Sequence, residues 1–263
     1  MSRMAKSHGH GVGASAYLRT LLGLGRVELV AFVGAGGKSS LLLGLGAELS
    51  GSTSSVVMTT TTRMGTEQIP GWATVCRTDR EVSAALERGE PVFLVGDIDG
   101  EKVIGVAPEV ADRVFGIAEV DYLLAEADGA RGRPFKAPAS HEPVIPTGAT
   151  LVVVVAGIDA IGRPIADIAH RPERVAALTG RRPDDLVRPA DMALVLGDAE
   201  GGRRGVPGGA RVVVALTKVS PGARAEAAAA IADWLEPDPN IDRVVTIDAV
   251  IGPGSDAGGI GVG

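Results

Sequence analysis

The feature that most constrains the fold is a glycine-rich junction between a strand-like and a helix-like segment. Residues 27–33 are short, apolar and β-branched, which is typical of a buried strand. Residues 38–49 repeat leucine at helical spacing. Glycines let backbone N–H groups converge on an anion where the helix dipole is positive. The sequence therefore predicts a phosphate-binding loop made of Gly34, Ala35, Gly36, Gly37, Lys38, Ser39 and Ser40.

The loop departs from the usual phosphate-loop pattern, G-x-x-x-x-G-K-[ST], because Phe32 occupies the first glycine position. A dinucleotide fingerprint is one alternative, but Ser39 stands at its third glycine and the run 59–62 offers no acidic residue for a ribose. A plain glycine turn is another. On the phosphate-loop interpretation, Lys38 reaches the terminal phosphates of ATP or GTP, and the hydroxyl of Ser39 or Ser40 ligates Mg²⁺.

Strand-like and helix-like segments alternate along the rest of the chain. This alternation predicts an α/β fold with a doubly wound, mostly parallel sheet. We expect a flexible N-terminal segment over residues 1–20, a single domain over 21–250 and a flexible glycine-rich tail over 251–263. The further expected strands are 56–60, 91–95, 122–127, 151–156, 212–216 and 244–247, and the expected helices are 80–88, 108–117, two within 172–196, and 221–235, with a small hairpin within 100–106.

Charge and cysteine content exclude several classes of protein. Lys and Arg number 26 and Asp and Glu 32, a formal net charge of −6, which argues against general nucleic-acid binding. Cys76 is the single cysteine, so the chain has no intrachain disulfide and no cysteine cluster for a metal. No segment resembles a signal peptide or is long enough to cross a bilayer. We expect a cytoplasmic protein without a membrane partner.

Two carboxylates stand at the carboxyl end of the strand expected at 122–127. Glu126 and Asp128 are two residues apart, so on a strand they point to the same side, at the sheet edge where open α/β sheets bind ligands. The catalytic hypothesis combines Lys38 with these two residues. Asp128 joins Ser39 as a Mg²⁺ ligand, and Glu126 acts as a base or positions water. The alternative is that one carboxylate only caps the turn at Gly129.

The stretch 129–148 is rich in proline and lacks a regular pattern, and a long ordered loop in a compact protein is usually functional. It gathers Arg131, Arg133 and Lys136 in a chain that is acidic overall. We expect these cations to bind an anionic second substrate, although a solvated basic loop has the same composition. His141 is either an acid/base group or a hydrogen-bonding residue of the loop.

Two further groups of residues lie at expected strand ends. Thr60 and Thr61 belong to a threonine run that supplies hydroxyls for Mg²⁺ or substrate, or that simply favours a strand. Thr217 and Lys218 stand where many P-loop GTPases carry a T/N-K-x-D motif that recognises the base. Ser220 replaces the acidic residue of that motif, so Lys218 is left to flank the base.

The order of these segments resembles the YqeC-type family, described as selenium-dependent hydroxylase accessory proteins. The matching stretches are 33–40, 58–64, 126–146, 155–159 and 170–173, of which 126–146 is the most distinctive. The resemblance implies a P-loop NTPase fold and a role in maturing molybdenum hydroxylases that carry a labile selenium cofactor. It implies functional positions at Lys38, Glu126, Asp128, Lys136, His141, Glu142, His170 and Arg171.

The leading hypothesis is thus a Mg²⁺-dependent NTP-hydrolysing accessory protein. Its partners would be a nucleotide, a molybdopterin-type cofactor or a selenium species, and a molybdenum hydroxylase. The alternatives are a carrier that binds a nucleotide-bearing molybdopterin without hydrolysis, and a small-molecule kinase.

Overall fold

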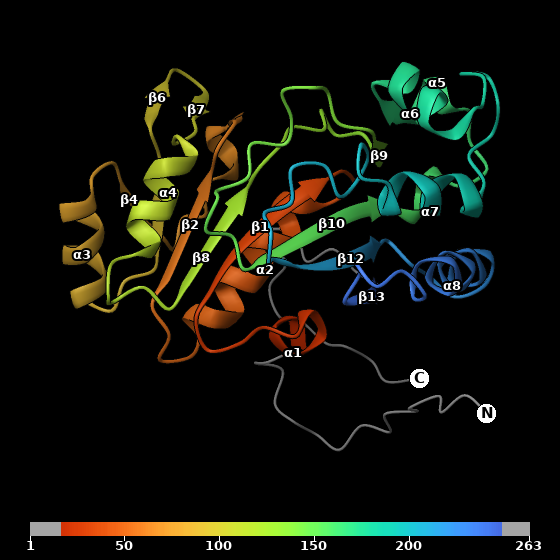
Figure 1. Ribbon diagram of the computed structural model, residues 1–263. Coiled ribbons are helices and arrows are strands. Elements are labelled where there is room, and N and C mark those ends of the chain that lie inside the picture. The colour runs from red at the N-terminus through yellow and green to blue at the C-terminus, as the bar shows by residue number, and fades with distance from the viewer. Residues whose placement is uncertain (1–16, 249–263) are drawn as a thin grey trace.

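A computed structural model describes residues 17–248, and its centre is one eight-stranded sheet in which every strand pair is parallel (Figure 1). Across the sheet the strands are β13 (Arg243–Ile247), β12 (Arg211–Thr217), β10 (Leu151–Gly157), β1 (Glu28–Gly34), β8 (Tyr122–Glu126), β2 (Val56–Thr60), β5 (Val92–Leu94) and β4 (Thr74–Cys76). The predicted α/β fold with a parallel sheet is confirmed.

Helices cover both faces of the sheet, as in a doubly wound fold. Along β1, Leu29, Ala31 and Val33 face one apolar core, and Val30 and Phe32 face the other. This alternation follows from the two-residue repeat of a strand and explains why every residue of β1 except the last is buried. The helices α1 (Tyr17–Leu22) and α2 (Lys38–Ser50) pack on one face, and α3 (Asp79–Glu87), α4 (Pro108–Phe115), α7 (Pro189–Gly197) and α8 (Ala223–Leu235) on the other.

Two small substructures project beyond the carboxyl ends of the sheet strands (Figure 1). The first, which we call the arm, is a three-stranded antiparallel sheet formed by segments that follow β2 and β5. The second, the lobe, is formed by segments that follow β8 and β10. The arm contains β3 (Arg63–Gly65), η1 (Thr66–Gln68), β6 (Asp97–Asp99) and β7 (Lys102–Ile104), and the lobe contains β9 (Phe135–Lys136), η2 (Ile158–Ala160), α5 (Ile165–Ile168), β11 (Ala169–His170) and α6 (Pro172–Thr179).

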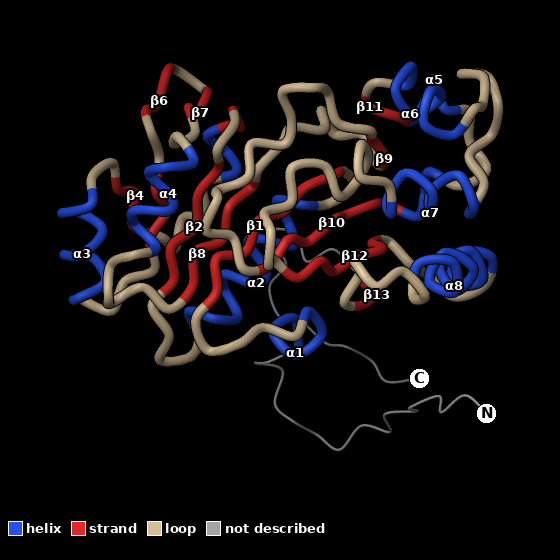
Figure 2. The backbone as a smooth tube through the Cα atoms, in the orientation of Figure 1, coloured by secondary structure: helices blue, strands red, loops and turns tan. Residues whose placement is uncertain are grey.

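Loops, not regular elements, connect the sheet to the lobe. The long loop after β8 runs along the carboxyl edge of the sheet to reach β9 (Figure 2). Its backbone is fixed to β10, because Gly157 N donates a hydrogen bond to Pro134 O at 2.8 Å. The segment that was expected to be irregular therefore crosses over the edge where β1 and β10 end.

A few expected boundaries differ from the structure. Residues 17–20, assigned to the flexible N-terminal segment, lie in α1, and the rest of that segment and the glycine-rich tail fall outside the described residues. The hairpin of the arm starts at Asp97, three residues earlier than expected. Helix α8 begins at Ala223 with Gly222 as its N-cap, so Pro221 precedes the helix. Among residues 17–248, no helix is long and apolar enough to cross a membrane.

Candidate functional site: a basic cleft over the glycine loop

The glycine loop joins β1 to α2 and lies directly against β10. Gly34 and Gly36 have φ angles of +92° and +83°, which favour glycine. A Cβ at Gly34 would lie 2.3 Å from Val155 O, and one at Gly36 would lie 2.4 Å from Gly157 N. The loop therefore has no room for side chains at these two positions, and Gly37 caps the helix that follows.

Lys38 folds back over its own loop. Its Nζ donates to Gly34 O at 2.7 Å and lies 3.1 Å from Asp128 Oδ1 and 3.7 Å from Glu126 Oε1. Burial alone would lower the pKa of this buried ammonium group, but the two carboxylates outweigh burial and raise the pKa. Lys38 therefore stays charged, held by carboxylates in a position beside the loop.

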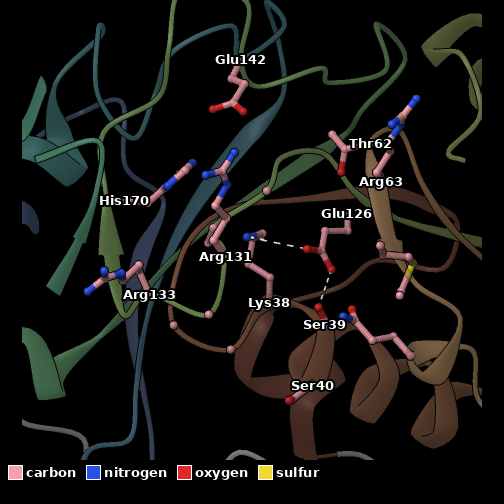
Figure 3. A pocket seen from close by; sticks show the side chains of 18 of the residues that line it. Lys38, Ser39, Ser40, Thr62, Arg63, Glu126, Arg131, Arg133, Glu142 and His170 are labelled. Atoms are coloured by element: carbon pink, nitrogen blue, oxygen red, sulfur yellow. Dashed lines mark hydrogen bonds and ion pairs between the residues drawn. The ribbon is translucent and has the colours of Figure 1, made fainter. Parts of the chain in front are cut away.

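Ser39 and Glu126 form a pair at the first turn of α2. The Ser39 hydroxyl donates to Glu126 Oε2 at 2.6 Å (Figure 3). Glu126 is the last residue of β8, and it lies level with Phe32 of β1 and Thr60 of β2 in the sheet register. Both Ser39 and Glu126 line the cleft above the loop, and Ser40 lines it as well.

Asp128 lies beneath the loop, only 1% exposed, and does not line this cleft. Gly34 N donates to its Oδ2 at 3.0 Å, and Lys136 Nζ lies 2.9 Å from the same oxygen. Together with Lys38, these contacts surround the carboxylate with a backbone N–H and two ammonium groups. Asp128 is thus placed to support Lys38 and the loop, away from the position that a cation beside Ser39 would occupy.

A series of ion pairs runs from Asp128 to the lobe. Lys136, also buried, donates to Gly129 O at 2.7 Å and to Glu142 Oε2 at 3.1 Å, and Arg171 lies 3.0 Å from the same Glu142 oxygen. Burial would raise the pKa of Glu142, but Lys136 and Arg171 outweigh it and lower the pKa. His170 contacts Arg171, and burial together with this cation lowers the pKa of His170. The glycine loop and the lobe are therefore connected by alternating charges.

The cleft above the loop has a volume of about 860 Å³ and is strongly basic. In Figure 3, Lys38 and Glu126 lie between Arg63 of the arm and the side chains of Arg131, Arg133 and His170. Two carboxylates, Glu126 and Glu142, line the cleft. Seven cationic side chains line it: Lys38, Arg63, Lys102, Arg131, Arg133, Arg171 and Lys218. In a chain with a net charge of −6, this gathering of positive charge favours an anionic ligand.

Comparison with known proteins identifies the family. The family model described as "YqeC protein" matches residues 30–173. The chain is also 33% identical over 216 residues to a protein of Escherichia coli (strain K12) described as "Uncharacterized protein YqeC", and the match covers 81% of this chain and 83% of that relative. The chain belongs to the YqeC family. The matched YqeC region contains the glycine loop, Glu126, Glu142, His170 and Arg171, and ends before Lys218.

Several residues expected at the site of this YqeC-family chain lie outside the cleft. Thr60 is buried and donates to Glu126 O, and Thr61 donates to Val144 O at 2.7 Å. Thr217 is buried and donates to Gly36 O. These hydroxyls connect neighbouring backbone segments. His141 is exposed and does not line the cleft.

Lys218 lines the cleft at the end of β12, with a φ of +58°. Its Nζ donates to Asp159 Oδ2 at 2.8 Å. The sequence pattern indicated Lys218 but not Asp159, which comes from the adjacent strand end after β10. Sequence reasoning also missed Arg63, Gln68 and Lys102 of the arm, although the stretch 58–64 that carries the YqeC resemblance contains Arg63.

The side chains fit a Mg²⁺ ion that is held mainly by phosphates. Within residues 17–248, no three or more His, Cys, Asp or Glu side chains form a group that would hold a metal. Mg²⁺ in nucleotide sites commonly takes one or two protein ligands, with phosphate oxygens and water completing the octahedron. The Ser39 hydroxyl and the Glu126 carboxylate are oxygen donors of this kind.

Proposed function

We propose that this YqeC-family protein binds a nucleoside triphosphate with Mg²⁺ on the glycine loop and hydrolyses it. One observation carries the proposal: Lys38, Ser39 and Glu126 converge at a glycine-lined helix N-terminus inside a basic cleft. This arrangement provides backbone N–H groups, a charged lysine, a hydroxyl and a carboxylate at one point.

The position of each residue in the cleft indicates the role that we assign to it. Lys38 neutralises phosphate charge, exchanging its contact with Gly34 O for phosphate oxygens. Ser39 and Glu126 would hold a Mg²⁺ ion, which would neutralise charge on the phosphates, and Glu126 would also orient the attacking water. Asp128, which the sequence suggested as a Mg²⁺ ligand, positions Lys38 from below. Lys218 flanks the base at the β12 end of the cleft.

Arg131, Arg133, His170 and Arg171 form the wall opposite the arm and would stabilise negative charge above the loop. His170, with its lowered pKa, is neutral near pH 7 and offers a hydrogen bond without a charge. We also propose a role in maturing selenium-dependent molybdenum hydroxylases, which the resemblance of the motifs at 33–40 and 126–146 to YqeC-type accessory proteins supports.

The first test is calorimetry of ATP, GTP and CTP with Mg²⁺ on the wild type and on Lys38→Ala. Loss of a charge-assisted contact of about 1.5–3 kcal/mol should weaken the Kd by about 10- to 150-fold. The matched control is Arg80→Ala, which removes an exposed cation on α3 outside the cleft. The proposal would be wrong if the nucleotide Kd were unchanged in Lys38→Ala, or if the wild type bound none of the three nucleotides.

The second test distinguishes an enzyme that hydrolyses the nucleotide from a carrier that only binds it. If Glu126 orders the attacking water, phosphate release should fall by roughly 10²- to 10⁴-fold in Glu126→Gln, while Glu109→Gln, an exposed residue on α4, leaves it unchanged. Tight nucleotide binding without phosphate release in the wild type would favour the carrier instead.

A further inference from the structure

The arm contributes two cations that the proposed function leaves unused. Arg63 lies on β3 and Lys102 on β7, and both side chains line the cleft. Both residues are exposed, and within the described part of the chain neither side chain forms an ion pair or a hydrogen bond. Their charges are therefore available to a ligand.

The antiparallel register places these cations on one face of the arm. Arg63 pairs with Ile104 and Gly65 with Lys102, and residues that face each other across two strands point to the same side. Arg63 and Lys102 are thus diagonal neighbours, roughly 7–8 Å apart at the backbone. Side chains as long as those of arginine and lysine can converge on one anion from this separation.

The opposite face of the arm fixes its position. Met64 and Val103 are buried in the core that also contains Leu42 and Leu43 of α2. At the root of the arm, Gly105 N donates to Thr62 O at 2.7 Å, and a Cβ at Gly105 would lie 2.4 Å from Thr60 O. Because the arm is packed against α2, its cations are held at a defined place beside the glycine loop.

The basic and acidic residues of the arm differ in whether they line the cleft. The arm has four acidic residues and two basic ones, and both basic residues line the cleft while none of the acidic residues does. The acidic residues are Glu67, Asp97, Asp99 and Glu101. Two of them lie on β6, the strand farthest from β3. In the register Asp99 pairs with Lys102 and Asp97 with Ile104, so both β6 carboxylates share the face of the arm cations, but among the described residues neither lies within ion-pair distance of them.

The position of the arm in the sheet order indicates which end of a nucleotide on the loop it would face. It follows β2 and β5, on the side of β1 where β8 presents Glu126, and Lys218 marks the other end, after β12. Met64 of the arm lines a small cavity together with Ser39 and Glu126, so the arm lies beside this pair. The arm is therefore next to the terminal phosphate. The cleft volume of about 860 Å³ is near the upper end of the roughly 300–1,000 Å³ that is usual for small-molecule sites, which leaves room for a second ligand.

We propose that Arg63 and Lys102 form a second anion subsite, which holds a small molecule bearing a phosphate-type oxyanion beside the terminal phosphate of the nucleotide. The subsite rests on the proposed function for the identity of its neighbour, but its own charges and geometry are independent of hydrolysis. Gln68 adds an amide at the same wall.

The test uses inorganic pyrophosphate as the probe, measured by calorimetry. The protein is first saturated with Mg²⁺ and a non-hydrolysable analogue of the nucleotide that binds, and pyrophosphate is then titrated in. We expect one further binding event, weakened roughly 10-fold or more in Arg63→Ala/Lys102→Ala, because each charge-assisted contact contributes about tenfold or more to binding. Arg80→Ala should bind pyrophosphate as the wild type does. The nucleotide Kd should change less than about twofold in the double variant.

Absence of a second binding event, or an unchanged pyrophosphate Kd in Arg63→Ala/Lys102→Ala, would overturn the subsite. A separate titration of pyrophosphate into Lys38→Ala distinguishes this failure from failure of the proposed function. If no nucleotide binds but pyrophosphate still binds Lys38→Ala and is lost when Arg63 and Lys102 are also replaced, the subsite stands and the nucleotide assignment fails. Pyrophosphate binding that disappears in Lys38→Ala, while that variant keeps the circular dichroism spectrum and Tm of a folded protein, would show a single anion site on the loop and would overturn the subsite.

Discussion

Two groups of cations near the cleft have opposite surroundings. The first is the buried group beneath the glycine loop, which we call the floor, and the second is the pair of cations on the arm. On the floor, Lys38 and Lys136 are 4% exposed and lie against the buried carboxylate of Asp128. On the arm, Arg63 and Lys102 are exposed, and no described carboxylate pairs with them. A buried cation must be paired with an opposite charge, whereas an exposed cation is solvated by water and needs no partner. Buried carboxylates therefore hold the floor charges in place, including Lys38 beside the loop, whereas the arm charges have no such carboxylate among the described residues.

The largest effect on stability should come from Asp128→Ala, which breaks the floor. The substitution leaves two buried ammonium groups and the Gly34 N–H without their shared acceptor. Breaking a buried ion pair costs about 3–5 kcal/mol, so the free energy of unfolding should fall by that amount in urea denaturation. Asp128→Asn, which keeps an acceptor for Gly34 N–H, should lose less. A loss below about 1 kcal/mol in Asp128→Ala would mean that the floor charges are not structural.

Two glycine-to-alanine substitutions should lower the stability by different amounts, more at the glycine loop than in the arm. Gly34→Ala introduces a Cβ 2.3 Å from Val155 O at a φ of +92°, and we expect a loss of about 2–5 kcal/mol from strain and overpacking together. Gly100→Ala in the arm has a positive φ but open space around it, so strain alone should cost about 1–2 kcal/mol. Equal losses in chemical denaturation would contradict the view that the floor is the more tightly packed region.

A smaller effect should appear in the pH dependence of stability. The pKa of His170 is lowered in the folded protein, first by burial and then by Arg171, from an unfolded value of about 6.5. The unfolded chain therefore takes up the proton first, and stability should fall as the pH drops from 7.5 through about 6.5. His170→Gln should reduce the difference in Tm between pH 7.5 and pH 5.5. Glu142, whose pKa is lowered, protonates below this window and does not interfere.

The smallest effect on stability should come from the arm cations. Arg63→Ala and Lys102→Ala remove exposed side chains that form no ion pair or hydrogen bond within residues 17–248, so the free energy of unfolding should change by no more than about 0.5 kcal/mol. Urea denaturation of the two variants measures this change. A loss of 2 kcal/mol or more would show that these cations are structural, like those of the floor.

The sequence predicted the sheet and the glycine loop because both depend on local patterns. Runs such as 151–156 are apolar enough to be strands only in a sheet covered on both faces, and the loop is defined by consecutive residues. The expected strands of the sheet are present, whereas β4 has three residues and β9 and β11 have two each, too short to leave a pattern.

The positions of individual site residues were harder to predict. Glu126 and Asp128 were expected to point to the same side, but β8 ends at Glu126, so the strand alternation no longer applies to Asp128. Asp128 turns inward, where Gly34 N, Lys38 and Lys136 surround it. Lys136 was expected to bind an anionic second substrate, but it is buried and pairs with Asp128 and Glu142. Its burial depends on the pairing of β9 with β11, a contact between distant segments that no local pattern encodes.

The contacts of the glycine loop also bear on how the protein folds. Gly34 is hydrogen-bonded to Asp128, 94 residues later in the chain, and Gly36 to Thr217, 181 residues later. Contacts so far apart in sequence close large loops and form slowly compared with local ones. A nascent chain that has only made β1 and α2 lacks both partners of the loop. The nucleotide binding that we propose should therefore appear late in refolding, after β8 and β12 have joined the sheet.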